Sequence, residues 1–210
     1  AEEVIELARV AGQYGGIYIS HLRNEAQGLL ESVEETIRIA EAAGLPAQIT
    51  HHKAMGAPMW GRSADSLALV DAANARGLDV TSDQYPYPAS STGLQAVFPK
   101  WSLGGGAAAI RSRIVDPEQR ARVRDGIVYA MINERGGNDP SKVVLAECRW
   151  DPSLNGLDLS EVLRLREIDV TIENAAELIM ELEYAGGCSV VYHAMSMQDV
   201  DRIMVHWDGW

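Results

Sequence analysis

The feature that most constrains this chain is a regular alternation of strand and helix patterns in its first third. Three short apolar runs, GIYIS, PAQIT and LDVTS, are typical of buried strands. Amphipathic helical patterns are expected before the first run, over 2–12, and between the runs, over 29–44 and 64–77. Gly44 is expected to end the second helix and Ser63 to cap the third. Repeated βα units of about 30 residues predict a parallel sheet covered by helices, and so an α/β fold.

Each of the three expected strands ends at or beside a polar residue: His21, His51 and Asp83. The carboxyl ends of parallel strands are where α/β barrels and open sheets keep their active sites. Neutral imidazole is the commonest protein ligand for zinc, so His21 and His51 are candidate ligands of one metal ion. The spacing alone leaves open that these are polar loop residues on a solvated rim.

Further candidates follow these strand ends. Lys53 is expected on the same side as His51, where it could neutralise an anionic substrate group or be an ordinary solvated lysine. Arg23 could orient a carboxylate beside a metal, or simply pair with Glu25. Tyr85, just past the third strand, could donate to a developing oxyanion. These three residues are the candidate substrate contacts.

The middle of the chain, about 90–186, breaks the rhythm. It is expected to be a mostly helical insertion that caps the mouth of the site, with helices near 117–134, 158–171 and 174–187 and the strand KVVLAE. Long segments after barrel strands often set specificity.

The last segment is expected to restore the strand–helix pattern, with SVVYH as a buried strand and a helix capped by Ser196. His193 at the strand end is a candidate third ligand or acid–base residue, with a rim histidine as the alternative. Asp208 could activate water as a general base beside a metal, or be a carboxylate in a frayed terminus.

Composition limits the partners and the location. The net charge of −12 repels a phosphate backbone, so nucleic-acid binding is not expected. Apolar runs fall short of the roughly 20 residues of a membrane span. The two cysteines show neither metal-ligand spacing nor a disulfide framework, which favours the cytoplasm. The 210 residues are fewer than the roughly 250 of a complete α/β barrel. The chain also opens without Met inside a helical pattern, so a fragment or a processed chain is expected.

Several stretches together resemble the N-acyl-D-amino-acid deacylase family of the amidohydrolase superfamily: ISHLRNE, ITHHKAMG, the DxYPY of SDQYPY, and VVYHAMSMQDVDRIMVH. The resemblance implies a partial TIM-like (β/α) barrel of the metal-dependent hydrolase type. It also implies that His21 and His51 hold zinc, and that Lys53 and Tyr85 contact substrate or oxyanion. The implied reaction is hydrolysis of the amide bond of a small-molecule N-acyl-D-amino acid by water activated at the zinc.

The chain also departs from that family. The family carries an HxH motif in its first strand and a cysteine before HxR, and both are absent here. Asp208 and Gly209 only echo the family's catalytic aspartate motif. Because catalytic zinc normally has three protein ligands, we expect this chain alone to bind zinc weakly and to have little activity. Open alternatives are a dihydroorotase- or isoaspartyl-dipeptidase-like hydrolase and a non-catalytic remnant.

Overall fold

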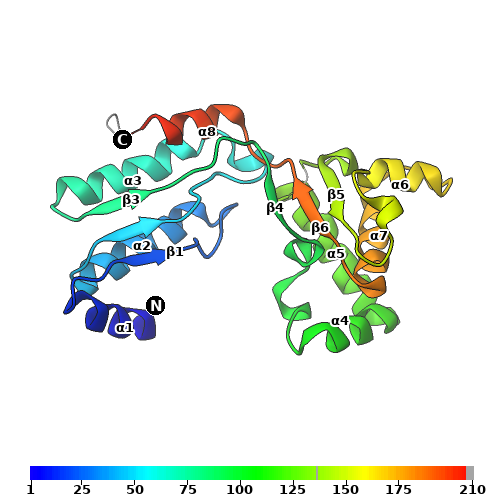
Figure 1. Cartoon of the computed structure of the whole chain (residues 1–210), viewed down its shortest axis with the longest axis horizontal. Helices are drawn as coiled ribbons and strands as arrows, with labels where there is room; N and C mark the ends of the chain where they lie inside the picture. Colours follow the sequence, from blue (N-terminus) through cyan, green and yellow to red (C-terminus); the bar gives the residue numbers. More distant parts are fainter. Residues whose placement is uncertain (136, 207–210) are drawn as a thin grey trace. The chain divides into compact units, whose positions relative to one another are not determined.

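The structure is a computed structural model that describes residues 1–135 and 137–206 (Figure 1). The chain divides into two compact units. The first is discontinuous: it contains Ala1–Pro88 and the segment that begins at Met195. The second is the intervening stretch, Ala89–Ala194.

The first unit is built on a three-stranded parallel sheet in the order β1-β2-β3. The strands are β1 (Tyr18–Ser20), β2 (Ala47–Ile49) and β3 (Val80–Ser82). The helices are α1 (Glu2–Gly12), α2 (Leu29–Ala43), α3 (Ser63–Ala75) and α8 (Met197–Met204), with a 3-10 turn at Ala57–Met59. The predicted strand–helix alternation and its parallel pairing are confirmed.

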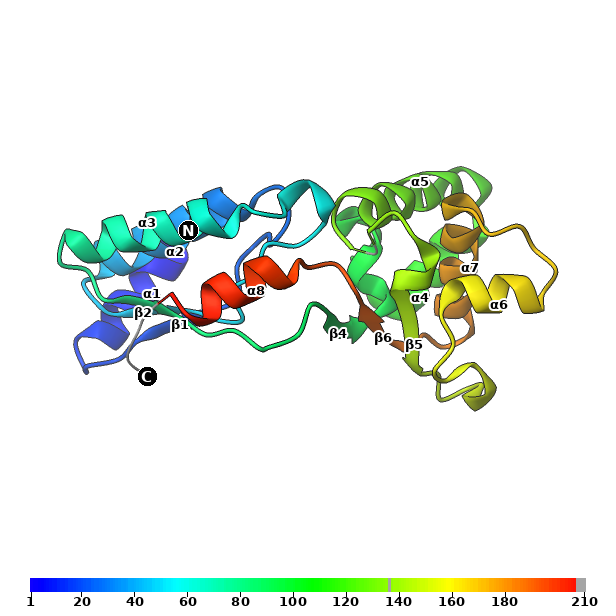
Figure 2. The ribbon, with the colours of Figure 1, turned by 90° about the horizontal axis from the view of Figure 1, so that it is seen from above.

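Helices α2 and α3 lie along one face of this sheet (Figure 2). Ile49 and Val80 from the strands are buried there against apolar residues of both helices, among them Val33 and Val70. On the opposite face, Ile19 in the middle of β1 is 56% exposed. Gly44 ends α2 in the left-handed conformation, with φ at 68°, as expected for a glycine at that position.

The second unit has an antiparallel sheet in the order β4-β6-β5. Its strands are β4 (Ser90–Gly93), β5 (Val143–Glu147) and β6 (Ser189–Tyr192). Its helices are α4 (Gly106–Val115), α5 (Pro117–Asn133), α6 (Leu159–Leu165) and α7 (Ile172–Ala185). Its described residues also form 3-10 turns at Leu94–Val97, Lys100–Ser102, Pro140–Lys142 and Pro152–Leu154.

Three expectations for this region need correction. SVVYH forms a strand and α8 follows it with Ser196 as its cap, both as expected. The strand is, however, the central antiparallel strand β6 and not a parallel one, because an apolar run does not specify its partner. Helix α4 begins in a glycine-rich run and lies outside the helices expected near 117–134, 158–171 and 174–187. The helix expected over 158–171 ends at Leu165, where Glu167 adopts a positive φ of 58°. None of the helices in residues 1–135 and 137–206 has the length and apolar character to span a bilayer.

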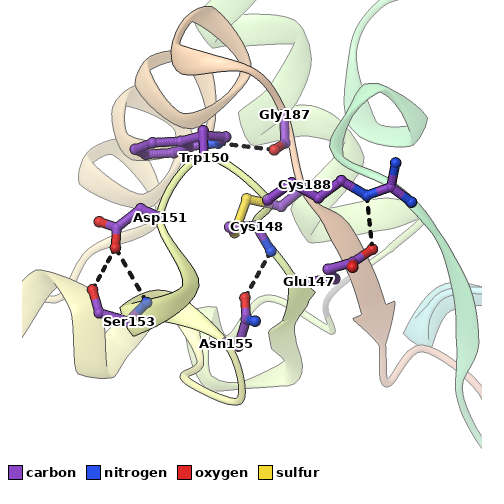
Figure 3. The surroundings of a disulfide bond; sticks show 9 residues. Glu147, Cys148, Trp150, Asp151, Ser153, Asn155, Gly187 and Cys188 are labelled. Carbon is purple, nitrogen blue, oxygen red and sulfur yellow. Dashed lines mark hydrogen bonds and ion pairs between the residues drawn. A yellow bond between two sulfur atoms is a disulfide. The ribbon is translucent and has the colours of Figure 1, made fainter.

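The two cysteines also differ from expectation, because Cys148 and Cys188 form a disulfide (Figure 3). They are separated by 40 positions in the sequence, but Glu147 pairs with Ser189 across β5 and β6. That register places the two cysteines opposite each other, with their Cα atoms 4.4 Å apart. Asn155 Oδ1 accepts a hydrogen bond from the Cys148 N–H at 2.7 Å. The covalent link therefore ties the end of β5 to the start of β6.

Candidate metal centre

The imidazole rings of His21 and His51 lie against each other. Their centroids are 4.4 Å apart with 27° between the ring planes, and His21 Nδ1 contacts His51 Nε2. The convergence follows from the sheet. Ser20 is in register with Ile49, so the chain leaves β1 and β2 at the same edge. His21 follows Ser20 directly, and His51 follows Ile49 after one residue, Thr50.

The backbone of His51 is held in an unusual conformation. Its φ is 43°, in the left-handed region that residues other than glycine rarely adopt. Asp83, just after β3, accepts a hydrogen bond from the His51 N–H at 2.6 Å and one from Gln48 Nε2 at 2.5 Å. Strained residues of this kind cluster at functional sites, where the surroundings stabilise them. The third strand end thus fixes the second histidine.

Glu25 orients the ring of His51 from its other side. Glu25 Oε1 lies 2.9 Å from His51 Nδ1 and 2.5 Å from Lys53 Nζ. Burial alone would raise the pKa of Glu25, but its hydrogen bonds to His51 and Lys53 and their positive charge outweigh burial and lower that pKa. In the tautomer that carries its proton on Nδ1, His51 donates to Glu25 and its Nε2 lone pair is directed at His21.

Lys53 and Tyr85, the two candidates that the resemblance implies, lie beside this pair. Lys53 is 3% exposed, and its Nζ is 2.5 Å from His51 Nδ1 and 5.6 Å from the centroid of the Tyr85 ring. The Tyr85 and Tyr87 rings are stacked with centroids 6.5 Å apart. Glu25 therefore contacts His51 and Lys53, while His21 lies against His51 and Tyr85 lies beside Lys53. The roles of these residues in binding stay predictions.

The remaining candidates are placed differently. Arg23 makes two hydrogen bonds to Glu35 of α2, at 2.8 and 2.9 Å, and not the pairing with Glu25 that the sequence left open. Those bonds and the charge of Glu35 raise the pKa of Arg23. His193 is exposed in the second unit, where its N–H donates to the Lys142 carbonyl at 2.9 Å. Asp208 lies outside the described residues.

The donor set fits a metal ion in part. Two imidazole nitrogens meet, and a carboxylate supports one ring through its far nitrogen, as in the carboxylate–histidine pairs of zinc sites. Within residues 1–135 and 137–206, however, no cluster of three or more His, Cys, Asp or Glu side chains is arranged to hold a metal. The described residues thus bring two candidate ligands together, whereas catalytic zinc normally has three protein ligands.

Sequence reasoning missed the roles of Glu25 and Asp83. Asp83 was placed only at a strand end, and Glu25 only as a partner for Arg23. An acidic residue follows each of the first and third strand ends, which is the available signal. Which histidine atom each carboxylate would reach depends on loop geometry, which the sequence does not display.

Comparison with known proteins gives a consistent result. No family model matches the chain. D-aminoacylase from Alcaligenes xylosoxydans xylosoxydans is 32% identical over 203 residues, which are 97% of this chain and 32% of that protein. N-acyl-D-glutamate deacylase from the same organism is 43% identical over 90 residues, 43% of this chain and 18% of that protein. The chain spans about a third of the length of the curated relative that it matches over 97% of its own residues.

Solved structures agree with the sequence matches. The crystal structure of N-acyl-D-glutamate deacylase from Bordetella bronchiseptica, complexed with zinc and a phosphonate mimic of the tetrahedral intermediate, aligns with a TM-score of 0.67 at 28% identity. It covers 97% of this chain and 33% of that one. A D-aminoacylase structure that defines a subset of amidohydrolases aligns with a TM-score of 0.66 at 30% identity, over 97% and 33%. By sequence and by fold, the chain is thus a relative of the N-acyl-D-amino-acid deacylases of the amidohydrolase superfamily, corresponding to about a third of their length.

Proposed function

We propose that this chain supplies the two-histidine part of a zinc-dependent deacylase that cleaves the amide bond of N-acyl-D-amino acids. The observation that carries the proposal is the contact between His21 and His51 at neighbouring parallel strand ends. Its support is the similarity to D-aminoacylase over 97% of the chain. Because the relatives matched are deacylases, the dihydroorotase- and isoaspartyl-dipeptidase-like alternatives are not favoured.

In this proposal, His21 Nδ1 and His51 Nε2 hold the metal. Bound zinc would polarise the amide carbonyl and lower the pKa of a water molecule. Glu25 keeps the proton on His51 Nδ1 and so keeps Nε2 available as a ligand. Lys53 and Tyr85 are proposed to contact the substrate, with the ammonium group shared between Glu25 and an anionic group. Arg23 is a further proposed substrate contact and Asp208 the proposed general base, as expected from the sequence.

We further propose that the parallel sheet is part of a TIM-like (β/α) barrel, with Ala89–Ala194 as an insertion. The order β1-β2-β3, with one face covered by α2 and α3 and Ile19 exposed on the other, suits three adjacent strands of such a barrel. That the insertion caps the mouth of the site stays a prediction.

Zinc binding tests the metal centre directly. We expect weak binding of Zn²⁺ by the 210-residue chain and its loss in His21→Ala and in His51→Ala, measured by competition with a chromophoric chelator. His193→Ala, a histidine of the second unit, is the matched control and should bind like the unchanged chain. Equal zinc affinity in all four proteins would overturn the assignment and favour a non-catalytic remnant.

A test of hydrolysis needs a protein of the full length of the relatives. A protein that carries this segment within the full length of its relatives is expected to hydrolyse N-acetyl-D-amino acids, and the 210-residue chain is expected to have little turnover. Substitution of His21 or His51 in the longer protein should abolish hydrolysis. A longer protein that binds zinc but cleaves only cyclic amides would contradict the substrate class and leave the metal site in place.

The expected cytoplasmic location stays a proposal, and the disulfide bears on it. Disulfides persist mainly in oxidising compartments and are rare in reducing ones. The Cys148–Cys188 bond, which the sequence did not predict, therefore favours an oxidising environment. Free-thiol labelling of the protein as it is isolated from cells would decide between the two.

A further inference from the structure

Helix α8 is fastened to the first unit by a buried carboxylate. Asp199, on its first turn, is 1% exposed. Its Oδ2 accepts a hydrogen bond from the Gly61 N–H at 2.8 Å, and its Oδ1 accepts from the Ser63 N–H at 3.3 Å and from the Ser63 hydroxyl. Arg202 Nη1 lies 3.1 Å from the same Oδ1. A buried carboxylate is stable only with such a set of partners.

The contacts of Asp199 cap the N-terminus of helix α3. Helix α3 begins at Ser63 without a capping side chain of its own, and Ser63 was expected to be that cap. Asp199 instead takes the cap position from a different part of the sequence, because its carboxylate accepts hydrogen bonds from Gly61 and Ser63 at the positive end of α3. The turn that leads from His51 into α3 is therefore anchored from α8.

A chain of buried hydrogen bonds continues from this anchor toward the histidine pair. The Ser66 hydroxyl donates to the Ser63 carbonyl at 3.1 Å, and His52 Nε2 lies 2.9 Å from Ser66 Oγ. Ser63, Ser66 and His52 are each 0% exposed. Because the Ser66 proton is used on Ser63, His52 Nε2 is the donor in the last bond. The chain thus ends at the residue that follows His51.

We propose that Asp199 is a positioning residue for the His21–His51 pair, acting through Ser63, Ser66 and His52 on the segment that carries His51 and Lys53. The expected effect on zinc binding rests on the proposed function. The chain of hydrogen bonds from Asp199 to His52 does not. Nothing in it requires Asp199 to touch substrate or metal. Replacing residues that orient metal ligands through hydrogen bonds typically lowers metal affinity 10- to 100-fold.

The test compares Asp199→Asn with Asp201→Asn in the 210-residue chain. The change is the same on the same helix, but Asp201 is exposed. Two readouts are made at a temperature where both variants are folded: the ¹⁵N signals of the His52 ring, which report its tautomer, and the affinity for Zn²⁺. We expect Asp199→Asn to move the His52 signals and weaken zinc binding at least about tenfold, and Asp201→Asn to change neither.

Ser66→Ala breaks the chain at its other end and leaves the Asp199 contacts intact. It should also shift the His52 signals and weaken zinc binding, and it decides the question if Asp199→Asn does not fold. Folded variants with unchanged His52 signals would overturn the inference. If the unchanged chain binds no zinc, the proposed function fails, and the His52 signals still report whether Asp199 acts on this segment.

Discussion

The Asp83 carboxylate accepts the backbone N–H of His51 at 2.6 Å, which joins the end of the third strand to the histidine that follows the second. His51 has a φ of 43° at this point. A bond to a charged acceptor contributes more than a neutral one, and here it offsets the cost of the left-handed backbone. The geometry of the histidine pair therefore depends on a residue that is not itself one of the two candidate ligands.

Replacement of Asp83 should loosen that geometry. We expect Asp83→Ala to lower the free energy of unfolding by about 1–3 kcal/mol, since a charged acceptor is lost, and to weaken zinc binding. Urea unfolding and zinc competition measure the two effects. Asp79→Ala, exposed just before the same strand, is the matched control. Equal zinc affinity in both variants would show that the His51 backbone does not need Asp83.

His52 predicts a specific acid sensitivity. Burial and the charge of Lys53 lower its pKa from 6.5 to about 4. Because the folded-state pKa is the lower one, the stabilisation is fully present above pH 6.5 and is lost as the pH falls toward 4. The loss is roughly 3 kcal/mol over that window. Unfolding by urea at a series of pH values should show this slope, and His52→Gln should flatten it.

An exposed histidine provides the control for that measurement. His193→Gln removes an exposed imidazole from the second unit and should leave the slope between pH 6.5 and 4 unchanged. Identical slopes in the wild type and His52→Gln would mean that acid unfolding is driven by other groups.

The disulfide should stabilise the second unit. It closes a loop across a sequence separation of 40, which corresponds to roughly 4 kcal/mol in the chain-entropy description. The melting temperatures with and without a dithiol reductant should therefore differ by about 10 °C or more. A variant with both Cys148→Ser and Cys188→Ser should unfold at the melting temperature of the reduced wild type. Its melting temperature should not change when reductant is added. If the melting temperature of the wild type does not change with reductant, the disulfide does not stabilise the second unit.

Gly126 offers a test of packing in the second unit. Replacing glycine by alanine in a helix usually stabilises it by about 1 kcal/mol. In α5, however, a Cβ at Gly126 would lie 2.7 Å from Pro99 Cγ. We expect Gly126→Ala to destabilise the unit by about 1–3 kcal/mol through overpacking. Gly104→Ala, where a Cβ meets nothing within 4 Å, should be neutral or slightly stabilising. A gain in melting temperature for Gly126→Ala would refute the overpacking.

The sequence predicts those features of the fold that depend on local patterns of apolar and polar residues. The parallel order β1-β2-β3 followed from the strand–helix alternation, and the meeting of His21 with His51 followed from that order. The disulfide could not be predicted in this way, because it depends on the antiparallel register of Glu147 with Ser189. The capping of α3 by Asp199 has no local signal either, since Asp199 and Gly61 are 138 positions apart.

The discontinuity of the first unit has a consequence for biosynthesis. Ribosomes deliver the first three strands well before α8, with the whole of Ala89–Ala194 emerging in between. Until translation reaches Asp199, Gly61 and Ser63 lack the acceptor that they have in the finished protein. Contacts this distant along the chain form slowly and leave early intermediates exposed. A nascent chain halted before α8 should therefore be more sensitive to proteases around Gly61 than the released protein.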